Sequence, residues 1–394
     1  MLRETWAEID PGCIADNLRA IRGMLPAGVK LMAVVKANGY GHGDLEAAEA
    51  ARQAGADYLG VAFLEEALRL RAGGVELPIL ILTPIRPDQV ELALARDLTL
   101  TVTGADWFRE LRKRHASFAG RKLRVHVKAD TGLGRIGFRT MAEWDALVPW
   151  LASPDIDVDG FYTHFATAGQ VDTAYLERQA RRFAKLMERS KASGIAIRHY
   201  HCAGSAAALR FPGLALDMVR IGAAMYGFHP ARPAPPVELK PALSLHSTLM
   251  QVKRVRRGEY IGYDNAYRPD ADEWIGTVPL GYADGWSQRM QGAAALVRGQ
   301  RAQVVGKISM DQLMLRLPGP FTPGDRVTLI GRQGGERISF AELAAHIDGP
   351  AQAITTALTE RVAKMYANAK EVRCPWNNAY FQQLRRVSDG SRAD

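Results

Sequence analysis

The chain has 394 residues, of which 47% are hydrophobic and 24% charged, a composition that excludes disordered and fibrous proteins. Its three cysteines are widely spaced, which excludes a disulfide framework and a thiolate metal site, and we predict no bound metal. The net charge of +9 comes from scattered basic residues rather than a stripe, so we interpret it as a solvated surface and predict no nucleic-acid partner.

The N-terminal sequence MLRETWAEIDPGC has acidic and polar residues where a secretory signal needs an apolar core. No apolar run reaches the roughly 18 residues of a membrane-spanning helix. We therefore predict a cytoplasmic protein with no membrane contact.

Short apolar runs alternate with helical patterns between about residue 30 and residue 227. Eight runs have the Val, Ile and Leu content of buried parallel strands: KLMAVVK, DYLGVAF, PILILT, LTLTVT, KLRVHVKAD, DVDGFYTH, IRHYHC and MVRIG. Between them, segments such as residues 44–55 and 173–194 have apolar positions at helical spacing and end in glycine. Eight such βα units predict an α/β fold, a (β/α)8 TIM barrel over residues 10–235.

The composition changes after residue 228, where the proline-rich HPARPAPPVELKP is typical of an interdomain linker. The segments that follow are short, rich in Val, Ile and Thr, and separated by glycine-containing turns: STLMQVKRV, EWIGTVPLG, AALVRG, QVVGKISM and RVTLIG. They predict a mostly β C-terminal domain over residues 236–375, with residues 1–9 as a candidate to pair with it. We expect residues 376–394 to form a flexible tail.

Lys36 ends the first predicted strand, within AVVKANGYGHG. Catalytic groups of a TIM barrel lie at the C-terminal ends of its strands. An isolated lysine there is more often a surface residue. Partial desolvation would lower its pKa and make its amine suitable for a Schiff base, and the glycines after it let the backbone pass close to a ligand.

The segment AVVKANGYGHG resembles the cofactor-lysine motif of the alanine racemase family. Further segments resemble that family in the same order over most of the chain: KADTGLGRIGF, FYTHFATAG, HYHCAGSAAALRFPG, MVRIGAAMYG, GYDNAY, LGYADGW and KISMDQ. The resemblance implies a pyridoxal-5'-phosphate-dependent isomerase that interconverts L- and D-alanine. It also implies a homodimer with shared active sites, and a supply of D-alanine for cell-wall peptidoglycan.

The resemblance also assigns roles to residues. Lys36 would hold the cofactor and act as one catalytic base, and Tyr263 would act as the second base on the opposite face of the substrate carbon. The other cofactor-binding residues would be Tyr40, His164, Ser205, Arg220, Gly222 and Ala223. Substrate would contact Arg135, Met310 and Tyr282. Supporting residues would be Lys128, His201 and Asp311.

Some of these roles also have a physical reason. Ser205 precedes a helical run of small residues, an N-cap position where the helix dipole favours an anion such as phosphate. Arg220 stays protonated, so a pyridine nitrogen that accepts its hydrogen bond remains unprotonated, which favours racemisation over decarboxylation. The resemblance implies that Lys128 is carbamylated, and an ordinary lysine paired with an acid is the alternative.

The sequence departs from the family pattern without losing a catalytic group. Asp264 stands where many members have glycine, and Gly204 where many have asparagine. Strictness for alanine therefore stays open, as do a broader racemase or a decarboxylase on the same fold, a non-catalytic pyridoxal-phosphate carrier, and a DNA-binding protein. Single-domain carriers lack the β module that contains Tyr263 and Met310.

Overall fold

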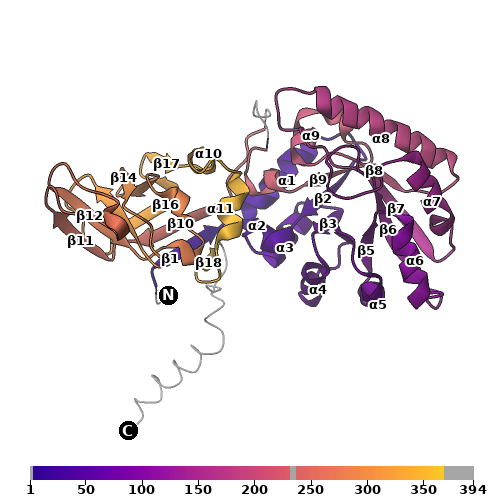
Figure 1. Cartoon of the computed structure of the whole chain (residues 1–394), viewed down its shortest axis with the longest axis horizontal. Helices are drawn as coiled ribbons and strands as arrows, with labels where there is room; N and C mark the ends of the chain where they lie inside the picture. The colour runs from indigo at the N-terminus through magenta and orange to yellow at the C-terminus, as the bar shows by residue number, and fades with distance from the viewer. Residues whose placement is uncertain (1–2, 231–236, 368–394) are drawn as a thin grey trace, which may run out of the picture. The chain divides into compact units, whose positions relative to one another are not determined.

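The computed structural model describes residues 3–230 and 237–367. The chain divides into two compact units (Figure 1). The first unit is Cys13–Lys240, and the second combines Met1–Gly12 with Pro241–Asp394. In the described ranges, no helix combines the length and hydrophobicity that crossing a membrane requires.

The described part of the first unit contains an eight-stranded parallel sheet in the order β8-β7-β6-β5-β4-β3-β2-β9. Its strands are β2 (Lys30–Val34), β3 (Tyr58–Val61), β4 (Ile79–Ile81), β5 (Leu98–Val102), β6 (Leu123–Lys128), β7 (Ile156–Tyr162), β8 (His199–His201) and β9 (Met218–Ile221). A parallel bridge between Gly204 and Arg220, with a 2.9 Å hydrogen bond from Arg220 N to Ala203 O, links the end strands. The sheet is therefore a nearly closed barrel, which confirms the predicted fold.

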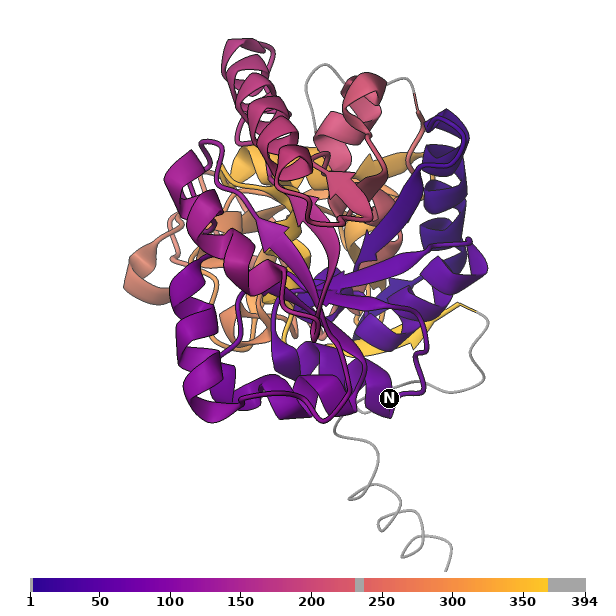
Figure 2. The same cartoon turned by 90° about the vertical axis from the view of Figure 1, so that its right-hand side faces the viewer.

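Helices lie around the strands, as the end view in Figure 2 shows. They are α1 (Pro11–Met24), α2 (Lys36–Tyr40), α3 (Asp44–Gln53), α4 (Leu64–Ala72), α5 (Val90–Ala95), α6 (Ala105–Arg114), α7 (Met141–Leu151), α8 (Ala174–Ala192) and α9 (Ser205–Arg210). In α8, Leu176, Phe183 and Leu186 are buried at helical spacing. Because helices cover the outside and side chains fill the inside, strands such as β3 are buried along their whole length.

The second unit contains, among its described residues, a ten-stranded sheet in the order β11-β12-β15-β14-β13-β16-β10-β1-β18, with β17 paired to β16. Its strands are β1 (Thr5–Ile9), β10 (Leu243–Thr248), β11 (Gln251–Val255), β12 (Glu273–Val278), β13 (Ala294–Val297), β14 (Gln300–Val305), β15 (Leu313–Leu317), β16 (Arg326–Gln333), β17 (Glu336–Ile338) and β18 (Ala363–Tyr366). Two helices, α10 (Phe340–His346) and α11 (Ala351–Ala357), accompany them. β1 pairs with β10 and β18, while the predicted tail, residues 376–394, lies outside the described residues.

Candidate active site

The carboxyl ends of the barrel strands surround a cavity of about 810 Å³. The cavity brings together the residues of this unit that the sequence assigns to cofactor or substrate, and also Lys128. These lining residues are Lys36, Tyr40, Lys128, Arg135, His164, Ser205, Arg220, Gly222 and Ala223. His201 is buried behind Arg220 and contacts it.

Lys36 is positioned by an unusual turn. Ala37, Asn38 and Tyr40 have φ angles of 52°, 52° and 53°, so the chain after β2 winds in the left-handed sense. This conformation costs about 1–2 kcal/mol for each residue that has a Cβ. The turn is held by a 2.7 Å hydrogen bond from Ala37 N to the carboxylate of Glu66. The strain is therefore concentrated where the chain presents Lys36 to the cavity.

The electrostatics of the cavity favour a neutral amine on Lys36. Burial and the positive charge of Arg135 lower the pKa of Lys36, and Glu66 opposes this shift only in part. A lysine must lose its proton before it can act as a nucleophile or a base. Lys36 is thus a candidate nucleophile at the barrel mouth.

A cluster of hydroxyl groups and backbone amides lies across the cavity. The predicted N-cap role of Ser205 is wrong, because Gly204 is the N-cap of α9 and Ser205 is its first residue. The Ser205 Oγ instead accepts hydrogen bonds from the backbone N–H groups of Gly222 (3.0 Å) and Ala224 (3.4 Å). A Cβ at Gly222 would lie 2.6 Å from the Tyr40 hydroxyl, so glycine permits this close approach. The cluster can bind an anion such as phosphate.

Four acceptors surround the terminal nitrogens of Arg220, one at Nη1 and three at Nη2. Its Nη1 donates to His201 Nδ1 at 2.8 Å, and its Nη2 donates to the carbonyl of Thr163 at 2.7 Å. Nη2 also lies 3.0 Å from His164 Nδ1 and 3.1 Å from the carbonyl of Cys202. Burial and the charge of Arg220 hold the pKa of His164 well below its ordinary value, so this ring is neutral and can accept. The guanidinium therefore faces the cavity in one orientation.

Lys128 is buried in the same cavity wall. Its Nζ lies 4.7 Å from the ring centre of Tyr162, and no carboxylate among the described residues forms an ion pair with it. Burial, followed by the charges of Arg220 and Arg135, holds the pKa of Lys128 well below its ordinary value. Asp130 opposes this shift only in part, and the carbamylation of Lys128 stays a prediction.

Tyr263 belongs to the second unit, so the structure does not place it at the Lys36 cavity. It begins a short 3-10 turn, Tyr263–Asn265, and its side chain is 69% exposed. Asp264 has a φ of 54°, the region that glycine adopts most readily. Here the Asp264 carboxylate pairs with Lys307 at 2.5 Å.

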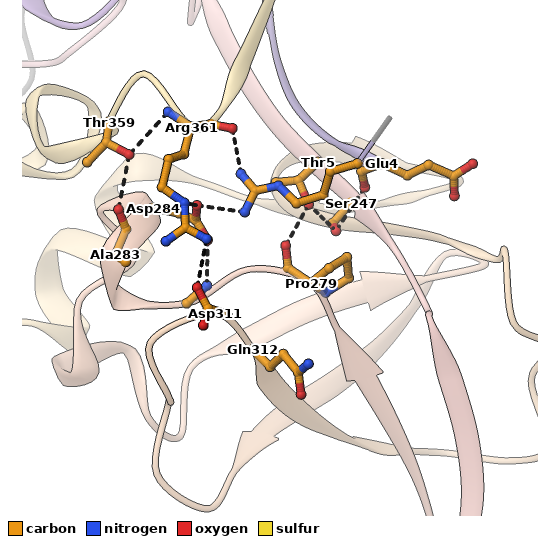
Figure 3. A network of polar contacts seen from close by, with 12 residues as sticks. Glu4, Thr5, Ser247, Pro279, Ala283, Asp284, Asp311, Gln312, Thr359 and Arg361 are labelled. Carbon is orange, nitrogen blue, oxygen red and sulfur yellow. Dashed lines mark hydrogen bonds and ion pairs between the residues drawn. The ribbon is translucent and has the colours of Figure 1, made fainter. Parts of the chain in front are cut away.

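Tyr282 and Met310 lie side by side in the second unit. The backbone N–H of Ala283 donates to the carbonyl of Met310 at 3.0 Å, and both Tyr282 and Met310 are exposed. Asp311, next to Met310, accepts a hydrogen bond from Arg361 at 2.7 Å (Figure 3).

A buried carboxylate supports this pair of segments. Asp284 is fully buried, its carboxylate accepts hydrogen bonds from Gly281 N (2.9 Å) and Arg3 (2.7 Å), and it forms an ion pair with Arg361 (3.2 Å). Figure 3 shows Arg361 between Asp284 and Asp311. Asp284 is absent from the residues predicted from sequence, although a carboxylate three residues after Gly281 is a signal of a turn held by its own side chain.

The fold and the cavity together define a class of protein. A nearly closed parallel barrel that presents a lysine amine, an anion-binding cluster and a fixed arginine at the carboxyl ends of its strands has the architecture of a barrel enzyme.

Comparison with known proteins gives the family. Residues 9–230 match the family model described as "Alanine racemase, N-terminal domain", and residues 242–366 match "Alanine racemase, C-terminal domain". The chain is 44% identical over 375 residues to the alanine racemase of Geobacillus stearothermophilus, covering 94% of this chain and 95% of that protein. The chain belongs to the alanine racemase family.

Solved structures of racemases have the same fold as this chain. The alanine racemase of Bacillus anthracis with bound L-Ala-P superposes with a TM-score of 0.90 at 41% identity, covering 94% of this chain and 97% of that one. A histidine racemase from Leuconostoc mesenteroides subsp. sake superposes with a TM-score of 0.85 at 31% identity, covering 93% and 98%.

Proposed function

We propose that the protein interconverts L- and D-alanine with pyridoxal 5'-phosphate held by Lys36. The observation that carries the proposal is one cavity that combines a lysine of lowered pKa with an anion-binding cluster, in a chain that aligns with alanine racemases over nearly its whole length.

The residues present suit this cofactor. The Lys36 amine can bind an aldehyde, and the hydroxyls of Tyr40 and Ser205 lie close to the backbone of Gly222, where a Cβ would fill the space. Burial raises the pKa of Tyr40 to about 12, so its hydroxyl stays protonated and can donate to a phosphate. Arg220 would donate to the ring nitrogen and leave it unprotonated. When bound, the cofactor would supply an electron-withdrawing ring that makes the substrate Cα–H acidic.

Racemisation needs two bases, because a single base that returns the proton to the same face restores the starting enantiomer. Lys36 is one base, and Tyr263 of the partner subunit is the second. The protein is thus proposed to be a homodimer in which each active site takes Lys36, Arg135 and Arg220 from one chain and Tyr263 from the other. Tyr282 and Met310 of the partner subunit would limit the space for the substrate side chain. D-alanine for peptidoglycan, made in the cytoplasm, is the proposed physiological role.

One experiment tests the substrate. The purified holoenzyme is given L-alanine, L-serine, L-lysine and L-histidine separately, and the D-enantiomers are measured by chiral chromatography. We expect D-alanine to form fastest. The histidine racemase among the structural relatives makes histidine the second candidate. Faster formation of another D-amino acid would replace alanine as the substrate, and release of CO2 would indicate a decarboxylase.

A further inference from the structure

A line of polar side chains runs through the interior of the barrel, beginning behind Arg220. His201 Nε2 lies 2.9 Å from His126 Nδ1, and His126 Nε2 lies 3.0 Å from Asp159 Oδ2. Asp159 Oδ1 accepts from Arg198 Nε at 2.8 Å. Three members of this line are buried, namely His201, His126 and Asp159, whereas about half of the Arg198 side chain is exposed.

Arg220 fixes the direction of the hydrogen bonds that lead from His201 through His126 to Asp159. An arginine has only donors, so His201 Nδ1 must accept from it and the single proton of His201 must be on Nε2. That proton is donated to His126 Nδ1, so the proton of His126 must also be on Nε2. This second proton is donated to Asp159, which can accept it only as a carboxylate.

The electrostatics are consistent with this order. Burial and then the charge of Arg220 hold the pKa of His201 well below its ordinary value, and burial lowers the pKa of His126 although Asp159 opposes it. Burial alone would raise the pKa of Asp159, but the hydrogen bonds from His126 and Arg198, together with the positive charge of Arg198, outweigh it and lower the pKa. Two neutral imidazoles and one carboxylate therefore occupy the line.

We propose that Asp159 and His126 are positioning residues for the reaction, because they hold His201 in the tautomer that accepts from Arg220 and thereby fix the guanidinium at the cofactor ring. The inference rests on the proposed function in one respect, the role of Arg220 toward the cofactor. The proton order itself follows from the donors and acceptors of the chain alone.

Asp159→Asn separates proton order from packing, because asparagine has nearly the same shape. Arg198 can only donate, whereas the Tyr58 hydroxyl, 3.3 Å from Asp159 Oδ2, can also accept, so the amide oxygen is expected to face Arg198 and the amide NH2 to face His126 and Tyr58. His126 Nε2 then has to accept, and both histidines must move their protons to Nδ1. His201 would present an N–H to Arg220, and that hydrogen bond would be lost.

The second variant is designed to restore the order. In Asp159→Asn/Arg198→Leu the asparagine can rotate and present its oxygen to His126. Asp157→Asn is the matched control, because Asp157 also binds Arg198, at 2.6 Å, but does not contact His126. We expect Asp159→Asn to lower kcat about 10- to 100-fold with little change in KM, the double variant to recover most of that loss, and Asp157→Asn to stay near wild type.

A measurement that does not use activity reads the tautomers directly. In the holoenzyme labelled with 15N-histidine, the NMR shifts of the ring nitrogens should show unprotonated Nδ1 atoms on His126 and His201, assigned with His126→Gln and His201→Gln. Asp159→Asn should protonate both Nδ1 atoms, and the double variant should reverse this. A wild-type spectrum with protonated Nδ1 atoms, or an Asp159→Asn enzyme with unchanged tautomers and kcat, overturns the proposal. If the wild type racemises no amino acid, the proposed function fails, while the NMR pattern still decides the proton order.

Discussion

Because Gly222 has no side chain, the Tyr40 hydroxyl can lie close to its backbone in the cavity. In Gly222→Ala the new Cβ would lie 2.6 Å from the Tyr40 hydroxyl, and the stacking of Tyr40 on Tyr226, with ring centres 4.9 Å apart, leaves it little freedom to move. Overpacking of this kind costs about 1–3 kcal/mol, so we expect pyridoxal phosphate to bind about tenfold more weakly or worse, measured by equilibrium dialysis. Gly213→Ala is the control, because a Cβ there has no neighbour within 4 Å. Equal affinity of both variants for pyridoxal phosphate would show that the space beside Gly222 does not contribute to binding the cofactor.

Lys128 gives a second prediction for a single residue. Addition of CO2 to its neutral amine forms an N–C bond and releases a proton, which would turn a buried neutral amine into an anion beside Arg135. Lys128→Ala should then lower kcat about 10- to 100-fold, and added acetate or propionate should restore part of the activity by replacing the lost carboxylate. Lys122 is an exposed lysine that precedes the same strand, and Lys122→Ala should leave kcat unchanged with or without added acetate or propionate. Loss of activity without rescue, together with an unmodified mass for Lys128, would count against the carbamate.

The residues that could be assigned from sequence are those whose motif is local. Lys36 and Tyr40 lie within one short segment, and the structure places both at the cavity. His126 and Asp159 could not be found in this way, because they are 33 residues apart and His201 is 75 residues from His126. Only the pairing of neighbouring barrel strands brings them into one line.

Among the elements, the left-handed turn after β2 stores strain that can be measured. Ala37→Gly removes the Cβ at a φ of 52°, so the free energy of unfolding should rise by about 0.5–1 kcal/mol. Ala180→Gly, in the middle of α8, should instead lower it by about 1 kcal/mol, because glycine disfavours a right-handed helix. Urea titration of both variants checks the opposite signs. A loss of stability in both would show that the turn is not strained at Ala37.

The buried carboxylate of Asp284 joins three segments of the second unit. Asp284→Ala leaves Arg3 and Arg361 without their shared acceptor and should destabilise the protein by about 3 kcal/mol. Asp311→Ala removes the exposed partner of Arg361 and should cost less than about 1 kcal/mol. Urea unfolding followed by tryptophan fluorescence checks the difference. Similar losses would mean that burial adds nothing to the Asp284 network.

How well a strand can be predicted from the sequence depends on how many of its faces are buried. The eight barrel strands were identified because both of their faces are buried, which leaves continuous apolar runs. In the second unit the predicted β-rich segment STLMQVKRV covers the end of β10 and the whole of β11, with a turn at Leu249 and Met250. β15 and β18 were not predicted, because short strands that are exposed on one face have a weak pattern.

At the scale of the whole molecule, the proposed homodimer can be tested by complementation. Lys36→Ala and Tyr263→Phe should each be nearly inactive, because each lacks the base for one face. After subunit exchange, a hybrid dimer has one site with both defects and one site with neither, so racemase activity should reappear. Mixing each variant with itself is the control. Hybrids that demonstrably form yet stay inactive would assign both bases to one chain.

The position of β1 affects how the protein is made. Thr5 pairs with Ser247, 242 residues later, so the first strand leaves the ribosome long before its neighbours exist. At the usual rate of about 5–20 residues per second, this delay is on the order of 12–50 s, and the barrel can fold in the meantime. During that time Trp6 and Ile9, on an unpaired strand, are exposed to the cell's chaperones and proteases. A nascent chain that stops before β10 therefore contains all eight barrel strands together with a β1 segment that has neither of its partner strands.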